Sequence, residues 1–159
     1  MKNIVLTRID DRLIHGQVVT AWVKHTKGNR IIIVDDQLST DSFMQQVLHM
    51  AAPTGIKVEV VNTVDASKLL KTEPKNNERI IILTKGPHVL EQLIINDGVE
   101  IRTIILGGIG AKSGRKKFYR NISIDDEELS CFKRLIDNDV KVFVQIVPDE
   151  RAISMEKLI

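Results

Sequence analysis

The chain has 159 residues, of which 43% are hydrophobic and 28% are charged. This composition is typical of a folded globular domain and excludes a disordered or collagen-like chain. Its 23 Lys and Arg residues nearly balance 21 Asp and Glu residues, and only 4% of the residues are aromatic. We therefore expect neither a general attraction to nucleic acid nor an aromatic platform for stacking bases.

The length predicts a single domain over residues 1–159 with a core of its own. The longest unbroken apolar runs are far shorter than the roughly 20 residues that a membrane-spanning helix needs. The amino-terminal segment MKNIVLT is too short for a signal peptide. The single cysteine, Cys131, excludes an internal disulfide and fits a reducing compartment. A cytoplasmic protein without direct membrane insertion is expected.

Six short runs rich in β-branched residues recur along the chain and predict strands. Longer segments with helical spacing separate most of them, which is typical of a mainly parallel sheet covered on both faces. The last run alternates in character and predicts a strand near an edge of the sheet. The expected fold class is α/β, a three-layer α/β/α domain with a mainly parallel central sheet and one edge strand of different character. The predicted strands are 4–6, 31–34, 58–61, 80–83, 103–106 and 140–147.

Helices are expected between these strands, and most begin at a recognisable start signal. The first should begin near Gly16, and the second after the Ser-Thr-Asp run at 39–41. A shorter helix is expected over 65–70, another at Pro87, and the last at the acidic run 125–128. The apolar residues that the longer helices should bury are Val18, Val19, Trp22, Val23, Phe43, Met44, Val47, Leu48, Leu129, Phe132, Leu135 and Ile136.

The segment RIDDRLIHGQ, residues 8–17, concentrates charge around a single histidine. It leaves the first predicted strand at its carboxyl end, where ligand sites collect in open parallel sheets. His15 directly precedes Gly16 and Gln17, where the helix should begin. The free N–H groups of a helix start favour a bound anion, and the same dipole keeps the imidazole neutral and nucleophilic.

The charged neighbours of His15 suit a phosphorylated imidazole. The planar fork of Arg12 or Arg8 matches phosphate oxygens and offsets charge in the transfer transition state. Asp10 or Asp11 would repel a phosphate directly, but either could hold an arginine or fix the imidazole tautomer. The segment therefore predicts a phosphohistidine site.

Other interpretations of this segment stay open. A single-chain acid/base or phosphate-ester enzyme could use His15 with Asp10 or Asp11; it should turn over a substrate without a partner and have a deep pocket. A non-catalytic anion- or nucleotide-binding module should depend only modestly on His15. A solvated ion-pair cluster with a surface histidine is the simplest alternative.

The stretch RIDDRLIHGQVVTAW resembles the start of the enzyme IIB component of the mannose–fructose–sorbose family of the bacterial sugar phosphotransferase system. The resemblance spans essentially the whole chain, including IVDDQLSTD at 33–41 and QIVPDE at 145–150. It implies that His15 is the phospho-acceptor and Arg12 the main phosphate-stabilising side chain. The same resemblance makes Arg8, Asp10, Asp11, Gly16 and Gln17 the rest of the loop.

The resemblance also implies the partners and the chemistry. The phosphoryl group would come from a histidine of a IIA protein or domain and leave to a sugar of the mannose, fructose, sorbose or N-acetylgalactosamine class. That sugar would be bound by membrane IIC and IID components, which would hold this chain at the inner face of the membrane. No metal or organic cofactor is implied, and the particular sugar and the oligomeric state stay open.

Further candidates lie at the ends of other predicted strands. If the fourth strand neighbours the first, Thr84 and Lys85 would lie beside the segment 8–17, and Asp35 from the second strand could join them. A plain strand-to-helix turn is the alternative.

The segment GGIGAKSG, residues 107–114, lacks the glycines of a Walker loop at Leu106 and Ala111. We interpret it as a mobile basic loop that continues to residue 117. The loop is either merely solvated or contacts an acidic surface at the rim of a partner protein. The histidines at 25, 49 and 88 have no metal-ligand spacing, although His88 follows a helix-starting proline. Cys131 is expected to pack rather than react.

Overall fold

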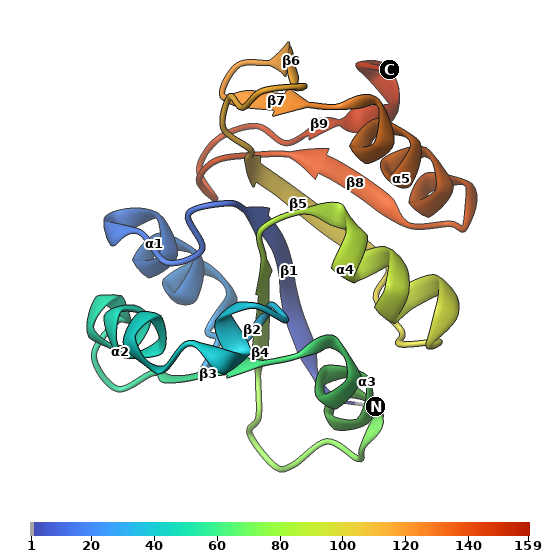
Figure 1. Cartoon of the computed structure of the whole chain (residues 1–159). Coiled ribbons are helices and arrows are strands. Elements are labelled where there is room, and N and C mark those ends of the chain that lie inside the picture. The colour runs from blue at the N-terminus through green and yellow to red at the C-terminus, as the bar shows by residue number, and fades with distance from the viewer. Residues whose placement is uncertain (1) are drawn as a thin grey trace.

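A computed structural model describes residues 2–159 as three layers built around a seven-stranded sheet of order β3-β2-β4-β1-β5-β8-β9 (Figure 1). All neighbouring strands in this sheet are parallel except β8 and β9, which are antiparallel. The predicted α/β class with a mainly parallel sheet is thus confirmed. The strands are β1 (Ile4–Asp10), β2 (Arg30–Val34), β3 (Lys57–Val61), β4 (Ile80–Thr84), β5 (Thr103–Gly108), β8 (Lys141–Val144) and β9 (Ile153–Ser154).

Helices cover both faces of the sheet. On one face lie α1 (Gly16–Thr26) and α2 (Ser42–Ala51), with the short 3-10 helix η1 (Leu38–Thr40). On the other lie α3 (Thr63–Lys71), α4 (Pro87–Glu91) with its π-helical continuation η2 (Gln92–Asn96), and α5 (Asp126–Asp137). The chain also forms a hairpin of β6 (Lys116–Tyr119) and β7 (Ile122–Ile124), and ends in the 3-10 helix η3 (Met155–Lys157). No helix within residues 2–159 combines the length and the hydrophobicity that a membrane crossing requires.

The predicted start signals act as helix caps. The Asp41 carboxylate accepts a hydrogen bond from the Met44 amide at the start of α2. Pro87 occupies the first turn of α4. Asp125 and Glu128 form a reciprocal capping box at the start of α5, in which each side chain accepts from the other residue's backbone. These bonds satisfy amide groups that a helix start otherwise leaves unpaired.

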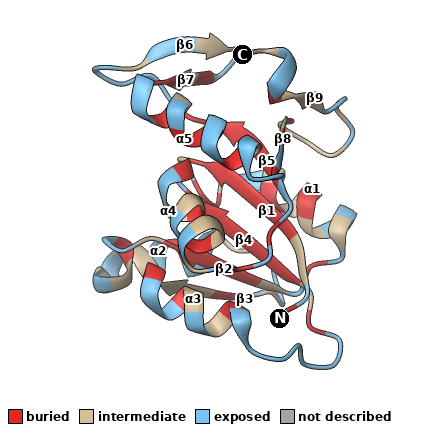
Figure 2. Ribbon diagram, turned by 90° about the vertical axis from the view of Figure 1, so that its right-hand side faces the viewer, coloured by how far each residue is buried: buried red, intermediate tan, exposed pale blue. Residues whose placement is uncertain are grey.

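The strands are buried because helices pack on both sides of them (Figure 2). All five residues of β4 are buried, as are 31–34 in β2. Two apolar clusters result, one beneath α1 and α2 and one beneath α3, α4 and α5. Burial on both faces explains why these strands are unbroken apolar runs rather than alternating ones.

Strand β1 lies at the centre of the sheet between β4 and β5. Its last residues are in register with the ends of both neighbours, Ile9 with Thr84 and Asp10 with Gly108. The loop that leaves β1, residues 11–15, therefore emerges at the middle of the carboxyl edge, and the fourth predicted strand does neighbour the first. We call residues 11–15 the His15 loop.

Three predictions from the sequence were wrong in detail. The last predicted strand is shorter, Lys141–Val144. It lies next to the edge, as expected, and the edge strand itself is the antiparallel, two-residue β9, which the polar sequence around it does not signal. The strands β6 and β7 were likewise missed. Phe43 and Val47 do not pack in the core: their exposed fractions are 70% and 41%, because α2 turns Met44 and Leu48 toward the sheet instead.

The orientation of α2 predicts that two substitutions on this helix lower the free energy of unfolding by unequal amounts. Phe43→Ser should change the free energy of unfolding by no more than about 0.5 kcal/mol, because the ring is already exposed. Leu48→Ala should cost about 2–5 kcal/mol, because it leaves a cavity in the core. Urea unfolding of both variants measures the difference, and equal costs would contradict the orientation of α2.

Candidate functional site

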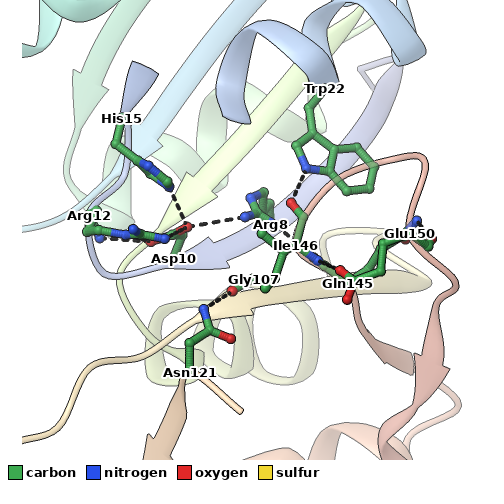
Figure 3. A network of polar contacts seen from close by, with 10 residues as sticks. All are labelled: Arg8, Asp10, Arg12, His15, Trp22, Gly107, Asn121, Gln145, Ile146 and Glu150. Atoms are coloured by element: carbon green, nitrogen blue, oxygen red, sulfur yellow. Dashed lines mark hydrogen bonds and ion pairs between the residues drawn. The ribbon is translucent and has the colours of Figure 1, made fainter. Parts of the chain in front are cut away.

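One buried carboxylate organises the site. Asp10 ends β1, and its side chain is 1% exposed. Its Oδ2 accepts hydrogen bonds from Arg8 Nη2 at 3.2 Å and from His15 Nε2 at 3.1 Å (Figure 3). Its Oδ1 accepts from the Arg12 amide at 3.0 Å and from Arg12 Nε at 3.3 Å. Asp10 therefore holds the two arginines and the imidazole in one network.

The charges in this network oppose the cost of burial. Burial alone would raise the pKa of Asp10, but hydrogen bonds from Arg12 and the positive charges of Arg8 and Arg12 outweigh it and lower the pKa below its ordinary value. Burial lowers the pKa of Arg8, with Asp10 partly offsetting that effect. Arginine stays protonated at neutral pH even so. Asp10 is thus an ionised acceptor, and His15 Nε2 must carry the hydrogen that it shares with it.

Arg8 joins the site to a distant part of the chain. Its guanidinium donates from Nη1 to the Gln145 carbonyl at 3.0 Å, just after β8, and lies 5.6 Å from the centroid of the Trp22 ring on α1. Trp22 Nε1 in turn donates to the Ile146 carbonyl at 2.9 Å (Figure 3). At 1% exposure Arg8 is a buried cation, and these contacts replace its lost hydration. It supports Asp10 rather than facing an incoming phosphate.

The space for Arg8 depends on a glycine in β5. A Cβ added at Gly107 would lie 2.1 Å from the guanidinium carbon and both terminal nitrogens of Arg8. The Gly107 carbonyl accepts a hydrogen bond at 2.8 Å from the side-chain amide of Asn121, which fixes the end of β5. Gly107 is therefore needed for the close packing of β5 against Arg8.

The His15 loop is anchored by its apolar residues. Leu13 and Ile14 are buried, and the Leu13 amide donates to the Asp10 carbonyl at 2.9 Å. Leu13 and Gly16 both have left-handed backbone, with φ of 57° and 49°, and for leucine this conformation is strained. The resulting sharp turn places His15 at the N-cap of α1, where its side chain makes no capping bond and is 25% exposed.

The remaining predicted loop residues separate into two groups. Arg12 is 53% exposed beside Asp10, and Gly16 and Gln17 are exposed at the first turn of α1. Asp11 turns away from the imidazole, because its carboxylate accepts from the Gly110 amide at 2.7 Å. Of the two aspartates that could fix the tautomer, the structure thus selects Asp10, and Asp11 ties the His15 loop to the loop after β5.

Thr84, Lys85 and Asp35 come to the same edge of the sheet but form their own contacts. The Thr84 hydroxyl is buried and donates to the Gly86 carbonyl at 2.9 Å. Lys85 Nζ lies 3.9 Å from Asp35 Oδ2. Among the described residues these contacts are not part of the Asp10 network. The geometry therefore makes these three residues a rim of the site, and their part in phosphate binding stays a prediction.

The predicted mobile basic loop is in part ordered. Arg115 donates to both carboxylate oxygens of Glu128 at 3.0 Å and to the Gly110 carbonyl, and Lys116 and Lys117 belong to β6.

Cys131 is fully buried in α5, as expected for a packing residue, and burial raises the pKa of its thiol to about 12. Sequence reasoning missed Gln145 and Asn121, because their contacts join segments that are far apart in the chain.

The comparisons identify the family. Residues 4–159 match the family model described as the PTS system sorbose subfamily IIB component. The chain is 34% identical over 153 residues to the sorbose-specific EIIB component of Klebsiella pneumoniae, covering 96% of this chain and 93% of that one. The crystal structure of the IIBSor domain of the sorbose permease from the same organism superposes with a TM-score of 0.92 at 33% identity, covering 98% and 94% of the two chains. The chain therefore belongs to the sorbose subfamily of IIB components of the phosphotransferase system, a class of phosphotransferases in sugar transport.

Relatives of this family also occur within longer proteins. The mannose-specific EIIAB component of Escherichia coli strain K12 is 33% identical over 156 residues. That match covers 98% of this chain but only 48% of the relative, so the chain spans about half the length of that protein.

The lowered pKa of Asp10 predicts how the stability of the protein depends on pH. The pKa of this carboxyl group is near the ordinary value of 3.8 in the unfolded chain and lower in the folded protein. Such a group stabilises the folded protein at pH values above its unfolded pKa. This stabilisation is lost as the pH falls through the folded pKa. The stability advantage of the wild type over Asp10→Asn should therefore be constant above about pH 5 and shrink below about pH 4. Urea unfolding across this range measures it, with Asp149→Asn on the surface as control. A difference that does not change with pH would contradict the ion-pair network.

The close approach of Gly107 to Arg8 predicts that even a methyl group is not tolerated there. Gly107→Ala should destabilise the protein by about 1–3 kcal/mol or more, because neither the strand nor the buried guanidinium can move freely. Gly86→Ala is the matched control. A Cβ added at Gly86 would lie 4.0 Å from the nearest atom, Glu128 Oε2, so there is room for it. Thermal unfolding of the two variants compares them, and equal melting temperatures would show that Arg8 is not confined as described.

Proposed function

We propose that this chain is a phosphocarrier in which His15 accepts a phosphoryl group from a phosphohistidine of a IIA protein or domain and passes it to a sugar. The observation that supports this most directly is the hydrogen bond of 3.1 Å between His15 Nε2 and the buried Asp10 carboxylate. An ionised carboxylate only accepts hydrogen bonds, so it selects the tautomer in which Nε2 carries the hydrogen. Nδ1 is then left with a free lone pair, and we assign it as the phosphorylated atom.

In each of the two transfers one bond to phosphorus breaks as another forms. In the first, the N–P bond of the donor histidine breaks as a bond forms between phosphorus and His15 Nδ1. In the second, that N–P bond breaks as phosphorus binds a sugar hydroxyl oxygen, whose proton is released. Asp10 holds the Nε2 hydrogen throughout and stabilises the positive charge that the phosphorylated imidazole gains.

The phosphoryl group itself would be stabilised by two features beside His15. The side chain of Arg12 is half exposed, tethered by Asp10 at one edge, and has further N–H groups for phosphate oxygens. The first turn of α1 begins immediately after His15, and its amide groups favour an anion at that place. Both features stabilise negative charge in the transition state without a metal ion.

The exposure of the site favours transfer between proteins over the alternative of a single-chain enzyme. His15 is on a surface loop and a quarter of its side chain is exposed, which lets a partner reach it. A cavity of about 760 Å³ extends from Lys2 and Arg79 at the amino ends of the strands to Gln145, and one of about 590 Å³ lies beside α1 and includes Gln17. Neither cavity is lined by His15 or Arg12. A phosphate-ester hydrolase would instead need an enclosed pocket at the histidine to position water and substrate.

The proposed partners and location rest on the likeness to relatives of the family. Relatives are named for sorbose, mannose, fructose and N-acetylgalactosamine, and one relative carries EIIA and EIIB in a single component. We infer that a IIA protein or domain is the donor, that membrane IIC and IID components present a sugar of this class, and that the chain works in the cytoplasm at the membrane face.

The central test is partner-dependent labelling. Incubation with phosphorylated IIA should place one acid-labile phosphate on the wild-type chain and none on His15→Ala. His49→Ala, which removes an exposed histidine on α2, should label like the wild type. Label on His15→Ala, or turnover of a small phosphate ester by the chain alone, would overturn the proposal in favour of another acceptor or of a single-chain enzyme.

A second substitution separates phosphate stabilisation from folding. Arg12→Gln should slow phosphoryl transfer by roughly 10²-fold, because it removes positive charge from the transition state. Its stability should fall less than that of Asp10→Asn, since the backbone amide of residue 12 still donates to Asp10 and the Arg12 side chain is half exposed. Rapid-quench measurement of transfer from phosphorylated IIA checks this, with the exposed Arg151→Gln as control. A rate within threefold of the wild type would exclude Arg12 from the reaction.

A further inference from the structure

A cluster of side chains that could ligate a metal ion lies away from the His15 loop, between α4 and α5. These helices pack side by side on the face of the sheet opposite α1, as both overall views show (Figures 1 and 2). His88 and Glu91 are three residues apart on α4, which places them on the same side of the helix. Cys131 faces them from α5, and the ligand atoms of the three residues all lie within 4.8 Å of one another.

We propose that His88, Glu91 and Cys131 form a binding site for a divalent transition-metal ion, of which Zn²⁺ is the best match. This site is independent of the phosphocarrier function proposed above. An imidazole nitrogen, a carboxylate oxygen and a thiolate sulfur are the three ligand types that zinc takes in proteins. Three protein ligands leave a fourth tetrahedral position for water.

The geometry needs only a small adjustment. Zinc bonds of 2.0–2.3 Å place tetrahedral ligand atoms about 3.3–3.8 Å apart. The ligand atoms now lie within 4.8 Å of one another, so side-chain movements of about 1 Å would bring them to the distances that zinc requires. His88 is exposed and Glu91 half-buried, so an ion could enter from the solvent side although Cys131 is buried.

Arg134 acts as an outer contact of this site. Its guanidinium makes two hydrogen bonds to Glu91, from Nε and from Nη2, the latter at 3.1 Å. A carboxylate has lone pairs enough to hold an arginine and a metal ion together, and such outer contacts orient metal ligands. On binding, the S–H bond of Cys131 breaks, a metal–sulfur bond forms, and the proton passes to solvent.

The sequence alone did not indicate this site. His88 and Glu91 have no other potential ligand at short spacing, and Cys131 lies far along the chain. The ligands converge only because α4 and α5 follow different strands and pack against each other.

Cobalt is a suitable probe because its absorption spectrum reports both thiolate ligation and tetrahedral geometry. The full chain should bind one Co²⁺ with a thiolate-to-cobalt charge-transfer band in the near ultraviolet and strong visible bands. Added Zn²⁺ should abolish both. Cys131→Ser should lose the charge-transfer band, and the exposed His88→Gln, which is not expected to disturb folding, should weaken binding at least tenfold. His49→Gln, a matched exposed histidine on α2, should bind like the wild type.

Thermal unfolding gives a second measurement. Zn²⁺ in excess should raise the melting temperature of the wild type and of His49→Gln by several degrees, and leave that of His88→Gln nearly unchanged. The proposal is wrong if the wild type shows only weak octahedral cobalt bands at millimolar Co²⁺. It is equally wrong if His88→Gln and the wild type bind alike.

Discussion

The structure of the site depends on the burial of one negative charge at the end of the central strand. Asp10 is ionised in a nearly dry position because Arg8, Arg12 and His15 all donate to it. Without the cations the carboxylate would take up a proton, and without the carboxylate Arg8 would be an uncompensated buried charge. The imidazole is therefore oriented by an interaction that the fold itself requires.

The sheet places this interaction where it is useful. Because β1 is flanked on both sides by parallel strands, its carboxyl end lies in the middle of an edge at which three loops meet. Arg8 extends the support across the domain to Gln145, and Gly107 leaves room for its guanidinium. His15 is thus held on a well-supported loop, which suits the proposed transfer, because the imidazole would have to meet its partners in a fixed geometry.

Much of this arrangement could be predicted from the sequence. The unbroken runs at 31–34 and 80–83 reflect burial on two faces, and the position of 8–17 after the first strand predicted that its charged residues gather at the carboxyl edge of the sheet. What could not be predicted depends on contacts between distant segments. Nothing local separates Asp10 from Asp11, whose roles are decided by the Gly110 amide. The exposure of Phe43 likewise depends on how far α2 rotates on the sheet, which its own spacing does not fix.

The claim that Asp10 sets the tautomer of His15 is tested most directly by ¹⁵N NMR of the imidazole nitrogens at neutral pH. His15 Nε2 should carry the hydrogen and Nδ1 should be unprotonated, and replacing Asp10 by asparagine should weaken this preference. A hydrogen found on Nδ1 in the wild type, or an unchanged tautomer without the carboxylate, would contradict it.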